Sequence, residues 1–332
     1  FVPKSIAIVG ASREKGKVGY NVLNNLVKYK FPGKIIPINP QAKTILGKKA
    51  YPSLRDVPGD INLAVFAIPA KAVVDVFDQV AEKQIPATII ISAGFKESGK
   101  EGAQLEARLA EKVASMNVRV LGPNCLGLID TEAKLNASFA AGMPAAGNIG
   151  FFSQSGALCT AILDWALGEG IGFSKFVSLG NKLDIDETDI LGEMGEDEQT
   201  EVILGYIEGV KDGKKFLEVA RAVAKKKPVI MIKSGGTEAG ARAASSHTGS
   251  LAGSERAFSA AFAQSGIIRV KSIEDLFDYA RAFSSRRYPG GNRVAIVTNA
   301  GGPAIIASDA VEHSSLKMAT FERETIAALR KS

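Results

Sequence analysis

The stretch VGASREKGKVG, residues 9–19, lies between a short apolar run, Ser5–Val9, and a helical pattern, Gly19–Tyr29. Apolar run, glycine-rich turn and helix, in this order, form the first unit of doubly wound α/β folds. The same order recurs in FFSQSGAL, residues 151–158, and in TNAGGPA, residues 298–304. Glycine and small residues let a ligand approach the carboxyl end of a strand, where helix N-termini offer free N–H groups. Each stretch is therefore a candidate anion site.

Short runs rich in Val and Ile alternate with helical stretches along the whole chain, which predicts parallel strands covered by helices on both faces. The first series of expected strands is Ser5–Val9, Ile35–Ile38, Leu63–Ala67, Thr88–Ile91 and Arg119–Leu121. The second series is Ile149–Phe152, Lys175–Ser178, Val202–Ile207 and Val229–Ile232, and a third begins with Val294–Thr298. We expect an α/β fold with domains at residues 1–128, 129–287 and 288–332. The third pattern stops early and the chain opens at Phe1, so we also expect a piece of a longer protein.

The composition restricts the class of protein. The 41 Lys and Arg residues against 35 Asp and Glu give a net charge of +6, which favours an anionic partner. The basic residues are scattered, and the densest run, Lys225–Lys227, falls where a helix should end, so nucleic acid is not expected. The longest charge-free stretch, Leu135–Leu163, is interrupted by polar residues and glycines, so no membrane span is expected. Cys125 and Cys159 are too few for a disulfide framework or a metal cluster, and we expect a reducing, cytoplasmic setting.

The first glycine-rich turn differs from that of dinucleotide-binding proteins. Gly10, Gly16 and Gly19 are spaced more widely than in G-x-G-x-x-G, and the second expected strand ends in Asn39 rather than in an acidic residue that could hold a ribose. These differences count against an NAD-dependent oxidoreductase. Lys17 and Lys43 instead suit a ligand that carries several phosphates. A tight turn without a ligand is the alternative.

Two further turns have the composition of phosphate cradles. Ser153, Gln154, Ser155 and Gly156 stand before an expected helix that runs to about Leu167. The serines lack the flanking glycines of a G-x-S-x-G hydrolase motif, so an acylated serine is not favoured. In SLGNKLDID, residues 178–186, Gly180 and Asn181 precede another expected helix. Each turn alone could equally be an ordinary helix cap.

One of the two histidines, His247, lies within SSHTGS, residues 245–250, in a loop of small residues from Ser234 to Ser250. A core histidine would have apolar neighbours, so we expect a general base or a nucleophile that carries a phosphoryl group, or else an exposed loop histidine without a role. A phosphorylated imidazole needs an acceptor for its other ring nitrogen. Glu208 follows an expected strand on the same sheet edge and is the best candidate, although it could also be a solvated loop carboxylate.

Taken together, the motifs resemble those of the NDP-forming acyl-CoA synthetases, which include ADP-forming acetyl-CoA synthetase and the α subunit of succinyl-CoA synthetase. The resemblance covers essentially the whole chain and depends on the order of VGAS, INP, ISAGF, GPNCLG, FSQSGAL, SLGN and SSHTGSLAG. It implies a Rossmann-like CoA-binding domain, a flavodoxin-like domain that resembles succinyl-CoA synthetase, and the start of a third α/β domain.

The resemblance also implies roles for individual residues. His247 would carry the phosphoryl group with Glu208 as its partner, and the phosphate would lie near Ser153, Gln154, Ser155, Gly156, Gly180 and Asn181. The residues expected to line the coenzyme A site are Gly10, Ala11, Ser12, Arg13, Lys17, Asn39, Pro40, Lys43, Pro69, Ser92, Ala93, Gly94 and Asn124. Apart from the resemblance, Cys125 in GPNCLG could be a nucleophilic thiol, but we expect an inert one because small loop cysteines commonly are, and we expect no metal ligands in this chain.

The implied reaction converts acyl-CoA, phosphate and ADP into the free acid, CoA and ATP through an acyl phosphate and phosphohistidine. The ATP-grasp domain that binds nucleotide in this family is absent from the sequence, so an ATP-grasp domain or β subunit is the expected partner, with Mg²⁺ and ADP or ATP bound there. An oligomer is expected. The alternative is a non-catalytic CoA-binding regulatory region of a larger protein, such as a protein acetyltransferase, but such regions lack the working histidine.

Overall fold

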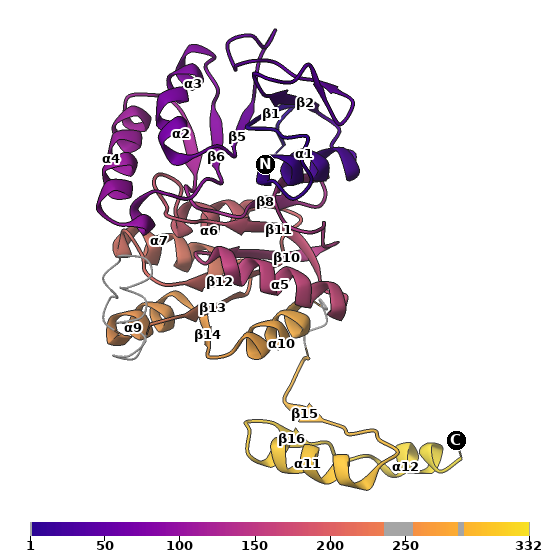
Figure 1. Cartoon of the computed structure of the whole chain (residues 1–332). Coiled ribbons are helices and arrows are strands. Elements are labelled where there is room, and N and C mark those ends of the chain that lie inside the picture. The colour runs from indigo at the N-terminus through magenta and orange to yellow at the C-terminus, as the bar shows by residue number, and fades with distance from the viewer. Residues whose placement is uncertain (1, 236–254, 285–288, 332) are drawn as a thin grey trace. The chain divides into compact units, whose positions relative to one another are not determined.

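The structure, a computed structural model, describes residues 2–235, 255–284 and 289–331. The chain divides into two compact units, Phe1–Ser284 and Ser285–Ser332. Figure 1 shows that the larger unit contains two stacked α/β parts, each a sheet with its own helices, which we call layers. One runs from indigo to magenta and the other from magenta to orange. Among the described residues, no helix combines the length and the apolar character that crossing a bilayer requires.

The first sheet has five strands in the order β2-β1-β5-β6-β7, and every neighbouring pair is parallel. Its strands are β1 (Ser5–Val9), β2 (Lys34–Ile38), β5 (Leu63–Phe66), β6 (Ala87–Ile90) and β7 (Arg119–Leu121), which agree with the predicted runs to within one residue at almost every end. A small hairpin, β3 (Thr44–Ile45) and β4 (Lys48–Lys49), follows β2. The strand order reverses direction between β1 and β5, which is where ligands bind in doubly wound sheets.

Helices cover both faces of this sheet. Helix α1 (Val18–Lys28) packs on one face, and α2 (Ala70–Val76), α3 (Asp78–Glu82) and α4 (Lys100–Ala114) pack on the other. A short 3₁₀ turn, η1 (Lys96–Ser98), leads into α4. The strands are almost continuously buried, because a parallel sheet with helices on both faces exposes neither of them.

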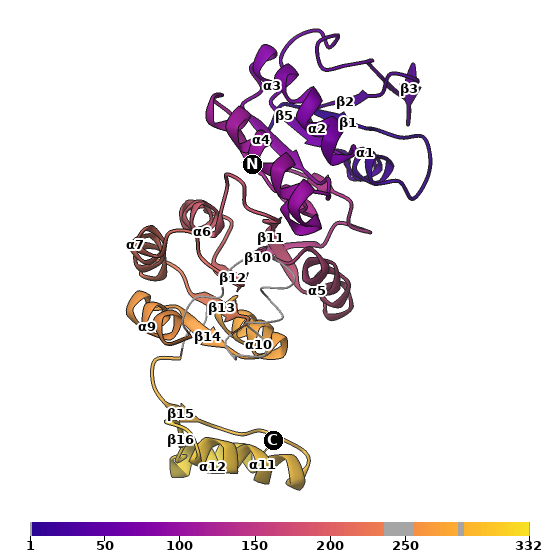
Figure 2. The ribbon, with the colours of Figure 1, turned by 60° about the vertical axis from the view of Figure 1, so that its left-hand side comes forward.

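The second sheet has seven strands in the order β14-β13-β12-β10-β11-β8-β9. The strands are β8 (Gly127–Asp130), β9 (Leu135–Ser138), β10 (Ala145–Ser153), β11 (Gly172–Ser178), β12 (Val202–Ile207), β13 (Val229–Lys233) and β14 (Ile268–Val270). Strands β10 to β14 are parallel and repeat the order of the first sheet, with the reversal between β10 and β12. Figure 2 shows α5 (Gly156–Glu169) and α10 (Ile273–Ser284) on one face, with α6 (Glu187–Glu196), α7 (Gly213–Ala224) and α9 (Glu255–Ser265) on the other.

Three strands of this sheet were not predicted. Strand β8 pairs antiparallel with both β11 and β9, so the sheet is mixed rather than wholly parallel. The sequence LNAS of β9 contains two polar residues, Asn136 and Ser138, yet it is fully buried because these side chains hydrogen-bond to each other (2.6 Å). The predicted boundary after residue 128 lies inside β8, and the division into domains remains a prediction.

The smaller unit contains β15 (Arg293–Val294), α11 (Gly301–Glu312), β16 (Lys317–Met318) and α12 (Arg323–Leu329). The predicted strand Val294–Thr298 was too long, because β15 ends at Val294 and pairs only with the two residues of β16. Val297, expected in that strand, is 96% exposed, and Val311 is the only buried residue in the described part of this unit.

The two layers of the larger unit are joined by backbone contacts. Three N–H groups that follow β11 donate to carbonyls of and after β7: Asn181 to Pro123 (2.8 Å), Leu183 to Gly122 (2.9 Å) and Ile185 to Val120 (3.1 Å). On the opposite side, the buried Asn25 of α1 donates from its amide to the carbonyls of Ser138 and Ala140, both at 2.9 Å. The carboxyl-end loops of the two sheets therefore meet.

The first glycine-rich turn depends on close backbone packing. A Cβ on Gly19 would lie 1.9 Å from the carbonyl oxygen of Gly10, and Gly10 itself has φ +91° and lies against the carbonyl of Ala67. The three atoms nearest to a Cβ on Gly19 are all backbone atoms of Gly10 and Ala11, so no side chain can move aside for it.

Gly19→Ala should therefore lower the free energy of unfolding by about 1–3 kcal/mol, the usual cost of overpacking a dense site. The matched control is Gly213→Ala in the first turn of α7, where a Cβ meets nothing within 4 Å. Urea unfolding compares the two variants with the unchanged chain. Equal midpoints for all three proteins would contradict the packing argument.

Candidate functional site

The predicted phosphate residues gather at the point where the second sheet reverses its strand order. Gln154 follows β10 and Glu208 follows β12, and these two strands are neighbours in the sheet. A cleft of about 960 Å³ opens there. Its lining includes the following predicted residues from both layers: Asn124, Gln154, Ser155, Gly156, Gly180, Asn181 and Glu208. The structure thus brings together side chains that are up to 84 residues apart.

The N-terminus of α5 lines this cleft. Ser155 is its N-cap and accepts from the N–H of Leu158 (3.3 Å), while Ser153 is fully buried and its hydroxyl bonds both the N–H and the carbonyl of Ser155 (3.0 Å each). Ser153 therefore holds the turn through hydrogen bonds to its backbone and does not line the cleft. Gly156 and Ala157, the first helical residues, have N–H groups without an intrahelical acceptor and line the cleft. This helix end can accept an anion.

Gly180 and Gly156, the two predicted glycines of the cleft, differ in whether the fold leaves room for a side chain. A Cβ on Gly180 would lie 2.2 Å from the carbonyl oxygen of Pro123, and its φ is +60°, so the fold itself demands glycine there. A Cβ on Gly156 would meet nothing nearer than the hydroxyl of Ser178 at 3.9 Å. The protein leaves the space beside Gly156 open, as a site for close approach of a ligand requires.

A buried network holds the Glu208 loop in place. The carbonyl oxygen of the Gln154 side chain accepts from the N–H groups of Glu208 (2.8 Å) and Gly209 (3.1 Å). Its amide donates to the Glu187 carboxylate (3.0 Å) and to the carbonyl of Gly209 (2.8 Å). Glu187 has no exposed surface and forms an ion pair with Lys182 at 2.9 Å, and Lys182 also donates to the carbonyl of Gly209 (2.9 Å). The buried side chain of Gln154 therefore holds the Glu208 loop in position.

Asn181 has a different environment from the one predicted. Its side-chain N–H groups donate to the carboxylates of Glu97 (2.6 Å) and Glu106 (2.7 Å), and its side-chain oxygen accepts from Asn124 (3.3 Å). Its amide donors are thus engaged with protein acceptors. In this geometry Asn181 links the loops of the two layers and does not offer a spare donor to phosphate.

The predicted coenzyme A residues follow the carboxyl ends of the first sheet's strands. Gly10 to Arg13 and Lys17 follow β1, Asn39 to Lys43 follow β2, Pro69 caps α2, Ser92 to Gly94 follow β6, and Asn124 follows β7. Pro40 is exposed, and so are Arg13, Lys17 and Lys43, as cationic contacts to a phosphorylated ligand need to be. The Asn39 amide donates to the carbonyl of Ala11 (2.8 Å), so its side chain braces the turn.

Both cysteines are free and buried. Burial raises the pKa of Cys125 to about 12, and its thiol donates to the carbonyl of Ile90 (3.4 Å). A thiol with this pKa is not ionised near neutral pH and is a poor nucleophile. The geometry agrees with an inert Cys125.

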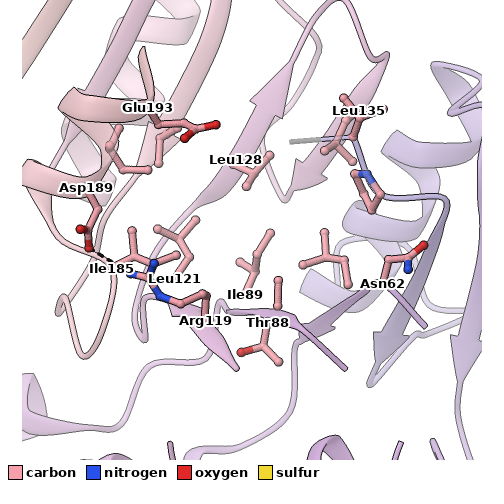
Figure 3. Close-up of a pocket in the computed structure, with 16 residues that line it drawn as sticks. Asn62, Thr88, Ile89, Arg119, Leu121, Leu128, Leu135, Ile185, Asp189 and Glu193 are labelled. Atoms are coloured by element: carbon pink, nitrogen blue, oxygen red, sulfur yellow. Dashed lines mark hydrogen bonds and ion pairs between the residues drawn. The ribbon is translucent and has the colours of Figure 1, made fainter. Parts of the chain in front are cut away.

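A second cavity, of about 460 Å³, lies at the opposite, amino ends of β5, β6 and β7. Figure 3 shows the apolar side chains of Ile89, Leu121 and Leu128 directed into it, with Arg119 joined to Asp189 at its rim. None of the residues predicted for the site lines this cavity. It is an imperfectly filled seam between the two layers.

His247 lies outside the described residues, so the structure gives no position for the predicted nucleophile. Glu208, its predicted partner, is half-buried in the cleft. Within the described ranges, no group of three or more His, Cys, Asp or Glu residues is arranged to hold a metal ion.

Comparison with known proteins identifies both layers. The CoA binding domain family matches residues 4–131, and the succinyl-CoA ligase-like flavodoxin domain family matches residues 146–283. The α subunit of ADP-forming acetate–CoA ligase II of Pyrococcus furiosus is 44% identical over 99% of this chain, which covers 72% of that subunit. The chain belongs to the NDP-forming acyl-CoA synthetase family.

Other family members agree. ADP-forming acetate–CoA ligase I of Archaeoglobus fulgidus is 46% identical over all of this chain and 48% of its own length. ADP-forming 4-hydroxybutyrate–CoA ligase of Nitrosopumilus maritimus is 46% identical over 96% of this chain and 46% of its own length. The chain therefore spans about half the length of these two relatives. Dinucleotide-forming acetyl-coenzyme A synthetase 1 of Candidatus Korarchaeum cryptofilum, solved with phosphate and ADP, superposes with a TM-score of 0.94 at 41% identity, over 100% of this chain and 71% of that one.

Several residues of the cleft were not predicted from the sequence. Lys182 and Glu187 stood within or next to the quoted SLGNKLDID motif, but nothing in the sequence showed that their charges meet in a buried pair. Glu97 follows the ISAGF motif, and only its spacing of three residues from Gly94 suggests that its side chain bonds the loop's N–H groups.

Gln154→Met should loosen the Glu208 loop, because it removes the acceptor of two N–H groups and a donor to the buried Glu187. An unsatisfied buried polar group costs about 1–3 kcal/mol, so backbone amide exchange at Glu208 and Gly209 should accelerate about tenfold or more. Hydrogen–deuterium exchange measures this rate. Gln104→Met, the same change at an exposed position of α4, should leave it unaltered. Equal exchange in both variants would show that Gln154 does not hold the loop.

Proposed function

We propose that this chain is the CoA-binding and phosphoryl-carrying region of an ADP-forming acyl-CoA synthetase. It would convert acyl-CoA and phosphate into an acyl phosphate and CoA, and would then pass the phosphoryl group through His247 toward ADP. The observation that carries the proposal is the cleft at the second sheet's reversal point. There the open N-terminus of α5, the uncrowded Gly156 and the carboxylate of Glu208 face one space.

The first sheet supports binding of coenzyme A. Its reversal point lies between β1 and β5, and the turn after β1 has the close backbone packing of a ligand-binding turn. Exposed Arg13, Lys17 and Lys43 supply positive charge near that turn. CoA would bind there with its thioester end directed toward the loops Ser92–Gly94 and Asn124, and Asn124 also lines the cleft.

The proposed chemistry has three balanced transfers. A phosphate oxygen attacks the thioester carbonyl carbon, the carbon–sulfur bond breaks, and the CoA thiolate takes up the proton that phosphate loses. A ring nitrogen of His247 then attacks phosphorus, and the phosphorus–oxygen bond to the acyl group breaks to release the carboxylate. Finally a terminal phosphate oxygen of ADP attacks phosphorus and the nitrogen–phosphorus bond breaks, which gives ATP and restores His247. Helix N–H groups already in place stabilise the negative charge that develops on phosphate.

Glu208 would act on His247 by accepting a hydrogen bond from the ring nitrogen that does not carry phosphate. That bond fixes the tautomer and makes the other nitrogen the nucleophile. Gln154 and the Lys182–Glu187 pair would serve this role indirectly, because they hold the backbone from which Glu208 projects.

ADP or ATP and its Mg²⁺ would bind to an ATP-grasp domain or subunit that supplies the rest of the synthetase. We propose a cytoplasmic oligomer of this kind. The acyl group is left open, since relatives named for acetate and for 4-hydroxybutyrate are equally identical to this chain at 46%.

The proposed phosphohistidine can be detected directly. Incubation with acetyl-CoA and ³²P-phosphate, with the nucleotide-binding partner supplied, should give an acid-labile and base-stable label on His247. His247→Asn should abolish the label. His313→Asn, which replaces the chain's other histidine at the end of α11, should retain it. An unlabelled wild-type protein that still binds CoA would favour a CoA-binding regulatory region instead.

Gly156→Ala should weaken phosphate binding about tenfold or more without weakening the fold. The added methyl group finds free space in the protein but occupies the space proposed for phosphate. Gly168→Ala, further along the same helix and also uncrowded, is the matched control. Calorimetric titration with phosphate and the thermal midpoint distinguish the two effects. If Gly156→Ala binds phosphate with the wild-type affinity, phosphate does not bind at this helix end.

A further inference from the structure

One carboxylate bridges the two proposed binding loops. Glu97, in η1, directs its two oxygens to opposite partners. Oε1 accepts from the N–H groups of Gly94 (2.6 Å) and Phe95 (3.1 Å), and Oε2 accepts from the side-chain amide of Asn181 (2.6 Å). The first pair belongs to the loop after β6 and the second partner to the loop after β11. This side chain therefore joins one loop to the other, beside a second link in which Lys96 donates to the carbonyl of Asn181 (2.5 Å).

These two loops carry different parts of the proposed reaction. Ser92–Gly94 belongs to the proposed CoA site, and Gly180 and Asn181 border the proposed phosphate cleft. Asn124 makes a parallel connection, since its backbone N–H donates to the carbonyl of Ser92 (3.0 Å) and its side chain donates to Asn181 (3.3 Å). The distance between the loops is thus set by hydrogen bonds.

We propose that Glu97 is a positioning residue, which holds the thioester end of CoA at reacting distance from phosphate by fixing the CoA loop to the phosphate loop. This inference rests on the proposed function. The step that it serves joins a phosphate oxygen to the thioester carbonyl carbon as the carbon–sulfur bond breaks. A misplacement of about 1 Å in such a step can reduce the rate about 100-fold.

Only a carboxylate suits the position of Glu97. It accepts at both ends, whereas a glutamine has an NH₂ group that would face N–H donors in one of the two loops. Burial works to raise the pKa of Glu97, but hydrogen bonds from Asn181 and from the Gly94 backbone outweigh it and hold this pKa below its usual range. The carboxylate form is therefore the one present near neutral pH.

The neighbouring Glu106 offers a matched comparison. It also accepts from the Asn181 amide (2.7 Å) and pairs with Lys96 (3.3 Å), and it has the same charge. In the segment after β6 it bonds Lys96, whereas the N–H groups of Gly94 and Phe95 donate to Glu97. Removing its charge tests the electrostatic effect without removing the bridge.

The test compares Glu97→Gln with Glu106→Gln in acyl phosphate formation from acetyl-CoA and phosphate, with any required partner supplied. Glu97→Gln should lower the rate at saturating substrates about 10- to 100-fold, while the Kd values of CoA and of phosphate, titrated separately, stay within about threefold of wild type. Glu106→Gln should stay within about threefold in rate. Should Glu97→Gln fail to fold, Glu97→Asp keeps the charge, shortens the reach and should show the same loss.

A third variant tests whether the lost rate returns when the hydrogen-bond donors and acceptors around residue 181 are exchanged. In the variant Glu97→Gln, Glu106→Gln, Asn181→Asp, the side chains around residue 181 exchange donors for acceptors, so it should recover most of the rate lost in Glu97→Gln, Glu106→Gln. A wild-type protein that forms no acyl phosphate would overturn the proposed function, and this inference with it. An active wild type with equal rates in Glu97→Gln and Glu106→Gln, or with a loss confined to Kd, would overturn the role of Glu97 alone.

Discussion

The close approach of two backbones, at Gly180 and Pro123, is the constraint on which the cleft depends. A side chain at residue 180 would collide with the Pro123 carbonyl at 2.2 Å, and the N–H of Asn181 donates to that same carbonyl at 2.8 Å. Because doubly wound sheets bind ligands at the carboxyl ends of their strands, this contact places the two candidate sites next to each other. The larger unit is therefore two similar folds whose carboxyl-end loops are in contact.

Much of this architecture could be predicted from the sequence, because parallel strands covered on both faces appear as runs of Val and Ile. The strands that were missed have no such run. Strand β9 is Leu-Asn-Ala-Ser, and its burial depends on a hydrogen bond between Asn136 and Ser138 that a linear pattern does not reveal. Strand β15 was predicted too long, since apolar residues form a strand only as far as a neighbour can pair with them.

The structure brings several of the predicted site residues together, and their roles remain predictions. Small residues after strands indicated the turns that hold Gln154, Gly156 and Gly180, and Glu208 was chosen as a carboxylate at the same sheet edge; all four line the cleft. Sequence could not separate a glycine that the fold requires from one that leaves space for a ligand, since that distinction depends on atoms from distant segments. Gln154 and Asn181 were expected to hold phosphate, yet their amides bond protein groups instead.

The amide contact of Asn25 between the two layers bears on the design of chimaeras between related proteins. Its two acceptors are the main-chain carbonyls of Ser138 and Ala140, which exist whatever side chains those positions carry. A chimaera that takes the CoA-binding layer from one synthetase and the flavodoxin-like layer from another therefore needs to preserve only one partner of this contact. For this contact, asparagine is needed only on the donor helix, whatever side chains stand at the two acceptor positions.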